Sequence, residues 1–255
     1  ECGKLAIASC ILRAEKRSQI YVDSSNIYNT INFRASKGCY LARLWQLLSE
    51  DCTYADLPSR LAKVNVVSFN YDRCLEHYLF HAVKSFYGAS DEQAASALAP
   101  LKVFHPYGSV GKLRWQSTNG ALDYGADPTS DKVNGASKSL RTFTEGIDPG
   151  AGEIDEIRGA LLGARIVVFL GFAFHQLNID LLYGEEPKQT FASRQWIIGS
   201  ALGLSLSNAD DCSQELARRS LASADQIVLR RELTAAQLLD EHSRLLAVRR
   251  QSRSA

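Results

Sequence analysis

The spacing of hydrophobic residues changes along the chain and separates expected helices from expected strands. Apolar residues recur at helical spacing over 5–16 and 39–50, which predicts two helices. The segment between them is polar with isolated apolar residues, which predicts a loop with a short strand. From Val64 onward, short apolar runs alternate with helical stretches.

Five short apolar runs bounded by turn residues or by the start of a helix predict buried strands. They are 64–69, 103–105, 166–170, 196–198 and 226–229. Further helices are expected over 72–87, 153–164, 177–183, 213–221 and 235–248. Strands that alternate with helices are typical of a parallel sheet covered on both faces. The expected fold class is therefore α/β, with a Rossmann-like parallel sheet and helices on both faces.

Segment 111–150 differs from its surroundings and is expected to be a loop-rich insertion, in place of a full small subdomain. It holds six of the 17 glycines and few large apolar residues. The length of 255 residues suits one or at most two domains, and we expect a single domain over 1–255. Its expected parts are a helical N-terminal part (1–60), a core (61–110 and 151–230), the insertion, and a C-terminal helix and tail (231–255).

Composition excludes several classes of protein. The 29 basic and 28 acidic residues give a net charge of +1, so no overall field favours nucleic acid or anionic membrane. The short arginine-containing segment 249–253 is expected to be a solvated tail. The apolar runs are too short to span a bilayer, which favours a cytoplasmic protein. The absence of methionine favours a sequence that is part of a longer chain, with a protein that is simply poor in methionine as the alternative.

Cysteine and histidine spacing gives little sign of a metal site. The six cysteines include no C-x-x-C pair, so free thiols and no structural zinc are expected. His77 and His81 are four apart on an expected helix and share a face, as metal ligands can. Glu76 precedes the first histidine, whereas the glutamate of the HExxH motif follows it. A packed or solvated helix face is the favoured interpretation, and metal binding is the alternative.

Ligands bind parallel sheets outside the carboxyl ends of the strands, so the residues that follow each strand are the candidates for a site. The first strand leads into SFNYDR at 68–73, where Asn70 can satisfy turn backbone and Asp72 can cap the next helix. The second leads into HPYGS at 105–109. The third leads into GFAF at 171–174, and the fourth ends at Gly199 and Ser200. Glycine at such ends lets backbone N–H groups face an anionic ligand.

Three of these blocks together resemble the sirtuin-like family. SFNYDR with Leu75 and Glu76 is similar to its "TxNYDxxxE" block, and 105–109 resembles the block that holds its "HG" signature. Residues 167–174 with Asn178 resemble the "VxxLGFSxxDxN" block, which binds the dinucleotide. The resemblance covers about 64–204. It is closest to bacterial effector domains that hydrolyse NAD in antiphage defence.

The sequence departs from the family pattern at four points. The glycine-rich "GAGxS" strand has no counterpart in the sequence. Tyr107 stands where the family has histidine before Gly108, and Ala173 and Gln176 stand where serine and aspartate are common. The zinc-binding cysteine quartet of protein deacylases is absent, which argues against deacylation.

The resemblance implies an NAD hydrolase, with NAD as substrate and no metal. Asn70 would fix the ribose and the attacking water, and His105 would be the base, because tyrosine with a pKa of about 10 is a poor base at neutral pH. Asp72 would hold the nicotinamide-ribose region or orient Asn70, or would only cap the helix. The full set of residues implied in NAD binding is Ser68, Phe69, Asp72, Tyr107, Gly108, Gly171, Phe172, Ala173, Gly199 and Ser200.

Two other interpretations stay open. A sirtuin-like module would bind or sense a nucleotide and act through a partner protein without cleaving it, which Tyr107 and Ala173 favour. A nucleic-acid-binding protein is disfavoured by the neutral charge. Because unregulated loss of NAD would poison a cell, we expect control by a homo-oligomer or by a partner defence protein such as an ATPase.

Overall fold

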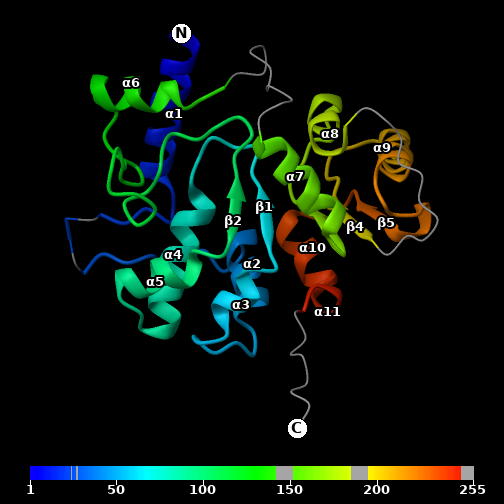
Figure 1. Ribbon diagram of the computed structural model, residues 1–255, viewed down its shortest axis with the longest axis horizontal. Coiled ribbons are helices and arrows are strands. Elements are labelled where there is room, and N and C mark those ends of the chain that lie inside the picture. Colours follow the sequence, from blue (N-terminus) through cyan, green and yellow to red (C-terminus); the bar gives the residue numbers. More distant parts are fainter. Residues whose placement is uncertain (24, 27, 142–151, 185–194, 248–255) are drawn as a thin grey trace. The chain divides into compact units, whose positions relative to one another are not determined.

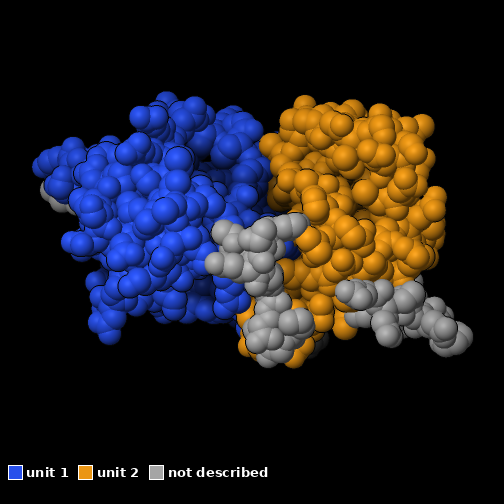
Figure 2. Space-filling view, turned by 90° about the horizontal axis from the view of Figure 1, so that it is seen from above, with its two compact units in different colours: residues 1–148 blue, residues 149–255 orange. Residues whose placement is uncertain are grey.

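The computed structural model describes residues 1–23, 25, 26, 28–141, 152–184 and 195–247 (Figure 1). The chain forms two compact units, Glu1–Asp148 (unit 1) and Pro149–Ala255 (unit 2), which Figure 2 distinguishes by colour. Each unit is described by itself below. The expected core segments 61–110 and 151–230 fall in different units, and the single domain over 1–255 stays a prediction.

Unit 1 contains a parallel pair of short strands, β1 (Asn65–Val67) and β2 (Lys102–Phe104). Both overlap the expected runs and have three residues each, so β1 is shorter than the expected 64–69 and β2 begins one residue before the expected 103–105. Val66 lies opposite Val103, and one further hydrogen bond joins Ser68 N to the Phe104 carbonyl at 2.8 Å. Pro106 has no N–H to donate, so the pairing of β2 ends near it.

Six helices are described in unit 1. They are α1 (Cys2–Arg17), α2 (Tyr40–Ser49), α3 (Leu57–Leu61), α4 (Cys74–Tyr87), α5 (Asp91–Leu98) and α6 (Ser130–Lys138). The helices expected over 5–16, 39–50 and 72–87 are confirmed by α1, α2 and α4. Helix α4 ends at Gly88, whose φ of 66° is left-handed and suits glycine. Helix α5 starts with a capping box between Ser90 and Gln93, a signal that the sequence analysis missed.

One expectation for unit 1 is wrong, and a second one lacked a helix. The described part of 20–38 contains turns but no strand, because its isolated apolar residues never alternate over a strand's length. The expected insertion 111–150 contains helix α6. Ala136 of this helix and Leu140, two residues beyond its end, are buried and pack on Ala8 and Leu12 of α1. Glycine and serine lower helix propensity, and this tertiary packing overrides them. Residues 142–150 of that segment lie outside the described residues.

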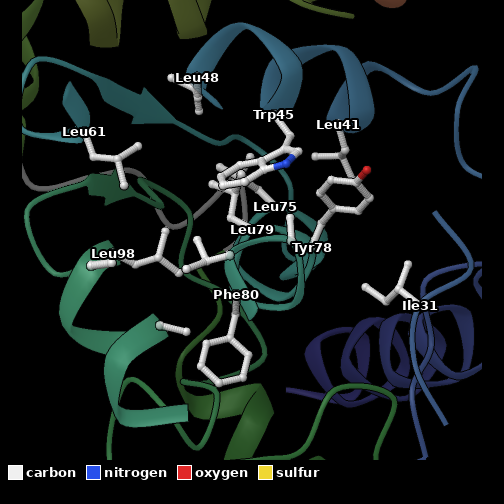
Figure 3. Packing of buried hydrophobic residues seen from close by; sticks show 14 of the residues in the cluster. Ile31, Leu41, Trp45, Leu48, Leu61, Leu75, Tyr78, Leu79, Phe80 and Leu98 are labelled. Atoms are coloured by element: carbon white, nitrogen blue, oxygen red, sulfur yellow. The ribbon is translucent and has the colours of Figure 1, made fainter. Parts of the chain in front are cut away.

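The main core of unit 1 lies between the strand pair and helices α2–α5 (Figure 3). Its buried side chains include Trp45 of α2, Leu79 of α4 and Leu98 of α5. Val66 of β1 and Val103 of β2 pack against this cluster from the sheet. The sheet is thereby fixed at the point where its strands lead into residues 68–73 and 105–109.

Unit 2 contains a three-stranded parallel sheet in the order β3-β4-β5. Its strands are β3 (Ile166–Phe169), β4 (Trp196–Ser200) and β5 (Ile227–Arg230), all at expected places. Its described helices are α7 (Gly152–Gly163), α8 (Gln176–Tyr183), α9 (Leu206–Arg219), α10 (Ala235–Glu241) and α11 (Ser243–Leu246), with a 3-10 turn at Ala224–Gln226. In Figure 1, α10 lies beside β4 and α9 beside β5, as their contacts also show.

Two helices of unit 2 differ from their expected bounds. Helix α9 begins at Leu206, well before the expected Ser213, because the Ser205 hydroxyl accepts from Asn208 N and caps it there. The helix expected over 235–248 is divided by His242 into α10 and α11, and residue 248 lies outside the described part.

The described residues thus form a mixed α/β protein with two small parallel sheets, one in each unit. Parallel pairing and flanking helices agree with the expected class, whereas one larger Rossmann-like sheet is not found among the described strands. None of the described helices has both the length and the apolar character needed to cross a membrane.

Candidate functional site

The parallel pairing of β1 and β2 brings Asn70 and His105 together at one edge of the sheet. Val67 and Phe104 are paired at the last residues of the two strands, so the chain leaves both strands at the same level. His105 Nδ1 lies 3.1 Å from the Asn70 carbonyl oxygen, to which it donates a hydrogen bond. The Asn70 residue is exposed, and no hydrogen bond of its side-chain amide is found among the described residues.

Glu76 of α4 holds the other side of the His105 ring. Its Oε1 lies 2.8 Å from His105 Nε2, and the two side chains are only 6% and 12% exposed. Glu76 lies in the segment that resembles the "TxNYDxxxE" block, but sequence reasoning gave it no role. Its position in the first turn of α4, directly after the loop that carries Asn70, is the signal that points to it.

The surroundings of His105 favour its charged form. Burial by itself would lower the pKa of the ring, but the hydrogen bond and charge of Glu76, the Asn70 carbonyl and the charge of Asp72 outweigh burial and raise it. Both partners of the ring are acceptors when Glu76 is ionised, so an imidazolium with two N–H donors satisfies the geometry. A base needs a free lone pair, so the neutral ring must give up one of these bonds before it accepts a proton.

The loop between β1 and α4 is held by its backbone and by Tyr71. The Tyr71 hydroxyl donates to the Arg141 carbonyl at 2.8 Å, and the Tyr71 carbonyl accepts from Val110 N at 3.0 Å. Asp72 Oδ1 accepts from Cys74 N at 3.0 Å, a local turn contact just before α4, whereas the N-cap residue of α4 is Arg73. This loop therefore presents the Asn70 side chain from a fixed backbone.

Arg73, the last residue of the loop, forms a buried ion pair with Glu15 of α1. Nη2 and Nε of Arg73 donate to the two carboxylate oxygens at 2.6 and 3.1 Å, and both side chains are 1% exposed. The carboxylate also accepts from the backbone N–H groups of Arg73 and Gly125, at 3.1 and 3.0 Å. The guanidinium donates further to the carbonyls of Leu122 and Asp123. Sequence reasoning missed Glu15, which lies 58 residues from Arg73.

Tyr107 and Gly108 have structural contacts at the same edge. The Tyr107 ring lies 5.9 Å from the Phe69 ring, and the Tyr107 carbonyl accepts from Arg141 N. Gly108 has a φ of +77°, and a Cβ there would lie 1.8 Å from the Ser139 carbonyl oxygen. The close backbone approach that was expected for a ligand is therefore made by residue 139 of the chain itself.

His77 and His81 form part of a packed helix face. His77 Nε2 donates to the Ile20 carbonyl at 2.9 Å, and its ring stacks on Tyr124 with centroids 3.9 Å apart. Burial lowers the pKa of His77 to about 3 and that of His81 to about 4, so both rings stay neutral. The favoured sequence interpretation agrees with these contacts, and no group of three or more metal-ligating side chains occurs in the part of the chain that is described.

In unit 2 the carboxyl ends of β3 and β4 are joined by a side chain. The Ser200 hydroxyl accepts from Gly171 N at 2.9 Å, so the amide that was expected to face a ligand already has a partner. A Cβ on Gly199 would meet Leu229 Cδ2 at 2.8 Å and Phe174 Cζ at 3.3 Å, so packing also requires this glycine. Ala173 is exposed, whereas Phe172 and Phe174 form an aromatic cluster with Phe169.

A shallow depression of about 220 Å³ lies between α8 and α9 of unit 2. Its lining consists of Phe174, Gln176, Ile179, Asp211, Cys212 and Glu215. Glu215 is paired with Arg218 and Arg219, and Gln176 donates to Asp180 at 2.9 Å. Two carboxylates and no basic side chain in the lining make it a poor match for the phosphates of a dinucleotide.

Comparisons with protein-family models, curated proteins and solved structures find no match to the chain. The site therefore has to be interpreted from its own residues. The structure brings Asn70, His105 and Glu76 together in unit 1, and it joins Gly171 to Ser200 in unit 2.

Proposed function

We propose that the protein is an NAD⁺ hydrolase that cleaves the bond between nicotinamide and ribose. The observation that carries the proposal is the exposed residue Asn70, whose backbone carbonyl contacts His105 at the carboxyl edge of β1 and β2, with Glu76 on the other side of the ring. The proposal includes the Rossmann-like fold and the role of an antiphage effector that depletes NAD. A homo-oligomer or a partner such as an ATPase would control it.

The reaction needs groups that position the ribose, position the attacking water and accept its proton, and these residues can supply all three. Nicotinamide leaves with the electrons of the glycosidic bond, and an oxocarbenium-like ribose is left behind. Water attacks the anomeric carbon and loses a proton, so the products are nicotinamide, ADP-ribose and one proton. The Asn70 amide can both donate and accept, so it positions the ribose hydroxyls and the water. His105 accepts the proton once its neutral ring has exchanged one of its hydrogen bonds for the water.

A specific observation favours a second candidate, a module that binds the nucleotide without cleaving it. Both nitrogens of His105 are engaged, and the family's histidine is replaced by Tyr107. In that case Asn70 would recognise the ribose, and the ring would only brace the loop. A partner protein would then carry out the response.

The test uses the full chain with NAD⁺ and measures free nicotinamide and bound nucleotide in the same samples. The variants are Asn70→Ala and His105→Ala, with Asn134→Ala as the matched control, since Asn134 is exposed on α6. We expect each site variant to lower kcat at least about 10²-fold, the contribution typical of a positioned acid–base group, and the control to keep it.

The outcomes separate the two candidates. Cleavage that depends on Asn70 and His105 supports the hydrolase. Binding of intact NAD⁺ that is lost in Asn70→Ala supports the binding module. Neither cleavage nor binding, or cleavage that both site variants retain, contradicts the assignment of this site to NAD.

A further inference from the structure

Glu76 is placed to control which nitrogen of His105 carries the proton. Nε2 faces the buried Glu76 carboxylate, whereas Nδ1 faces the Asn70 carbonyl on the exposed side. The two acceptors differ in charge, because one is a carboxylate and the other a neutral amide. The hydrogen bond to the carboxylate is therefore the stronger of the two.

This difference decides which proton the charged ring loses first. Loss from Nε2 would set its lone pair against the Glu76 oxygen at 2.8 Å in a buried position. Loss from Nδ1 removes only the hydrogen bond to the Asn70 carbonyl, a neutral acceptor on the exposed side. The neutral ring therefore keeps its proton on Nε2 and exposes its lone pair on Nδ1.

Other groups also face this part of the site. The negative charge of Asp72 acts on His105 from the loop before α4. Tyr40 of α2 lies near the same acidic groups, since burial and then the charges of residues that include Asp72 and Glu76 raise its pKa.

We infer that Glu76 is a positioning residue for the proposed hydrolysis, because it keeps the His105 proton on Nε2 and leaves the lone pair of the neutral ring on Nδ1, beside Asn70. The inference rests on the proposed function for its catalytic consequence. The tautomer itself is a property of the free protein. In Glu76→Leu, no group accepts from Nε2, whereas Nδ1 keeps the Asn70 carbonyl as its acceptor, so the proton moves to Nδ1 and the exposed lone pair is removed.

The test combines a spectroscopic measurement with kinetics. In the full chain labelled with ¹⁵N-histidine, proton–nitrogen correlation spectra distinguish the two neutral tautomers, and His105→Ala identifies the His105 signal among the five histidines. Once the ring is neutral, we expect the Nε2–H form in the wild type and the Nδ1–H form in Glu76→Leu. We expect kcat of the variant to fall at least about 10²-fold, as for a base held in the wrong tautomer, with KM nearly unchanged.

Glu92→Leu is the matched control, because Glu92 is an exposed acid of α5. It should change neither the tautomer nor kcat. An Nδ1–H tautomer in the wild type, or an unchanged tautomer in Glu76→Leu, overturns the inference, and the wild-type result needs no folded variant. A changed tautomer with full activity also overturns it.

The test separates failure of the inference from failure of the proposed function. A wild-type chain that leaves NAD⁺ intact contradicts the hydrolase and the catalytic role of Glu76 together. The spectra then still decide whether Glu76 fixes the His105 ring. A hydrolase whose activity does not depend on Glu76 keeps the proposed function and removes only the inference.

Discussion

Replacement of Glu15 by glutamine should destabilise unit 1 severely. The Glu15 carboxylate accepts four hydrogen bonds, from Arg73 N, Nε and Nη2 and from Gly125 N. In Glu15→Gln one oxygen becomes an NH₂ group that can only donate, and it meets donors. The Arg73 guanidinium keeps the carbonyls of Leu122 and Asp123 but loses its counter-charge.

The magnitude follows from this geometry. Each buried donor left without an acceptor costs about 1–3 kcal/mol, and removal of one partner of a buried ion pair costs about 3–5 kcal/mol. These contributions overlap, because the same atoms carry them. We therefore expect the free energy of unfolding of unit 1 to fall by about 3–5 kcal/mol, a large part of the stability of a typical domain.

Urea unfolding followed by tryptophan fluorescence measures this loss, since Trp45 is buried in the core of unit 1. The matched control is Asp127→Asn, which breaks an exposed ion pair between Asp127 and Lys16, the neighbour of Glu15 on α1. That variant should unfold close to the wild type. A loss below about 1 kcal/mol in Glu15→Gln would refute the reasoning that the buried pair depends on both partners.

Two further predictions concern stability. Gly108→Ala should destabilise the chain by more than about 3 kcal/mol, since its φ is +77° and its Cβ would meet the Ser139 carbonyl at 1.8 Å. Gly120→Ala, at φ +67° with nothing within 4 Å, should lose only about 1 kcal/mol, and equal shifts in Tm would contradict this. Burial lowers the pKa of His77 from 6.5 to about 3, so the unfolded chain binds a proton that the folded chain does not, and stability falls as the pH falls below 6.5. Between pH 6.5 and 4.5 the wild type should lose about 2 kcal/mol more than His77→Gln, measured by urea unfolding, and parallel losses would show that His77 is not the cause.

Local patterns predicted most elements of the fold because the decisive interactions lie close in sequence. Gly88 ends α4 and the β-branched run of β3 forms a strand, both as expected. Helix α6 was missed because its stability depends on packing against α1, more than a hundred residues earlier. Capping boxes such as that of Ser90 were available in the sequence and could have placed α5.

The candidate site was predictable in part. The rule that parallel strands end at one edge placed Asn70 beside His105, and the structure agrees. The contacts of Gly108 with Ser139 and of Gly171 with Ser200 were not predictable, because no local pattern shows which segment fills the space beside a glycine. Glu76 was part of the recognised sequence pattern, but its role could not be predicted, because only the packing of α4 shows that its side chain contacts the His105 ring.

The hydrogen bond between Glu15 and Gly125 joins residues 110 positions apart, and this separation has a consequence for synthesis on the ribosome. Helix α1 is made before the loop that holds Gly125, whose N–H donates to Glu15. It is also made before α6, which covers Ala8 and Leu12. Bringing Glu15 and Gly125 together closes a long segment of chain, and the entropic cost of this closure is not offset until α6 has been made and can pack on α1. We therefore expect nascent chains that stop short of α6 to leave the apolar face of α1 exposed, as a binding site for chaperones until unit 1 closes.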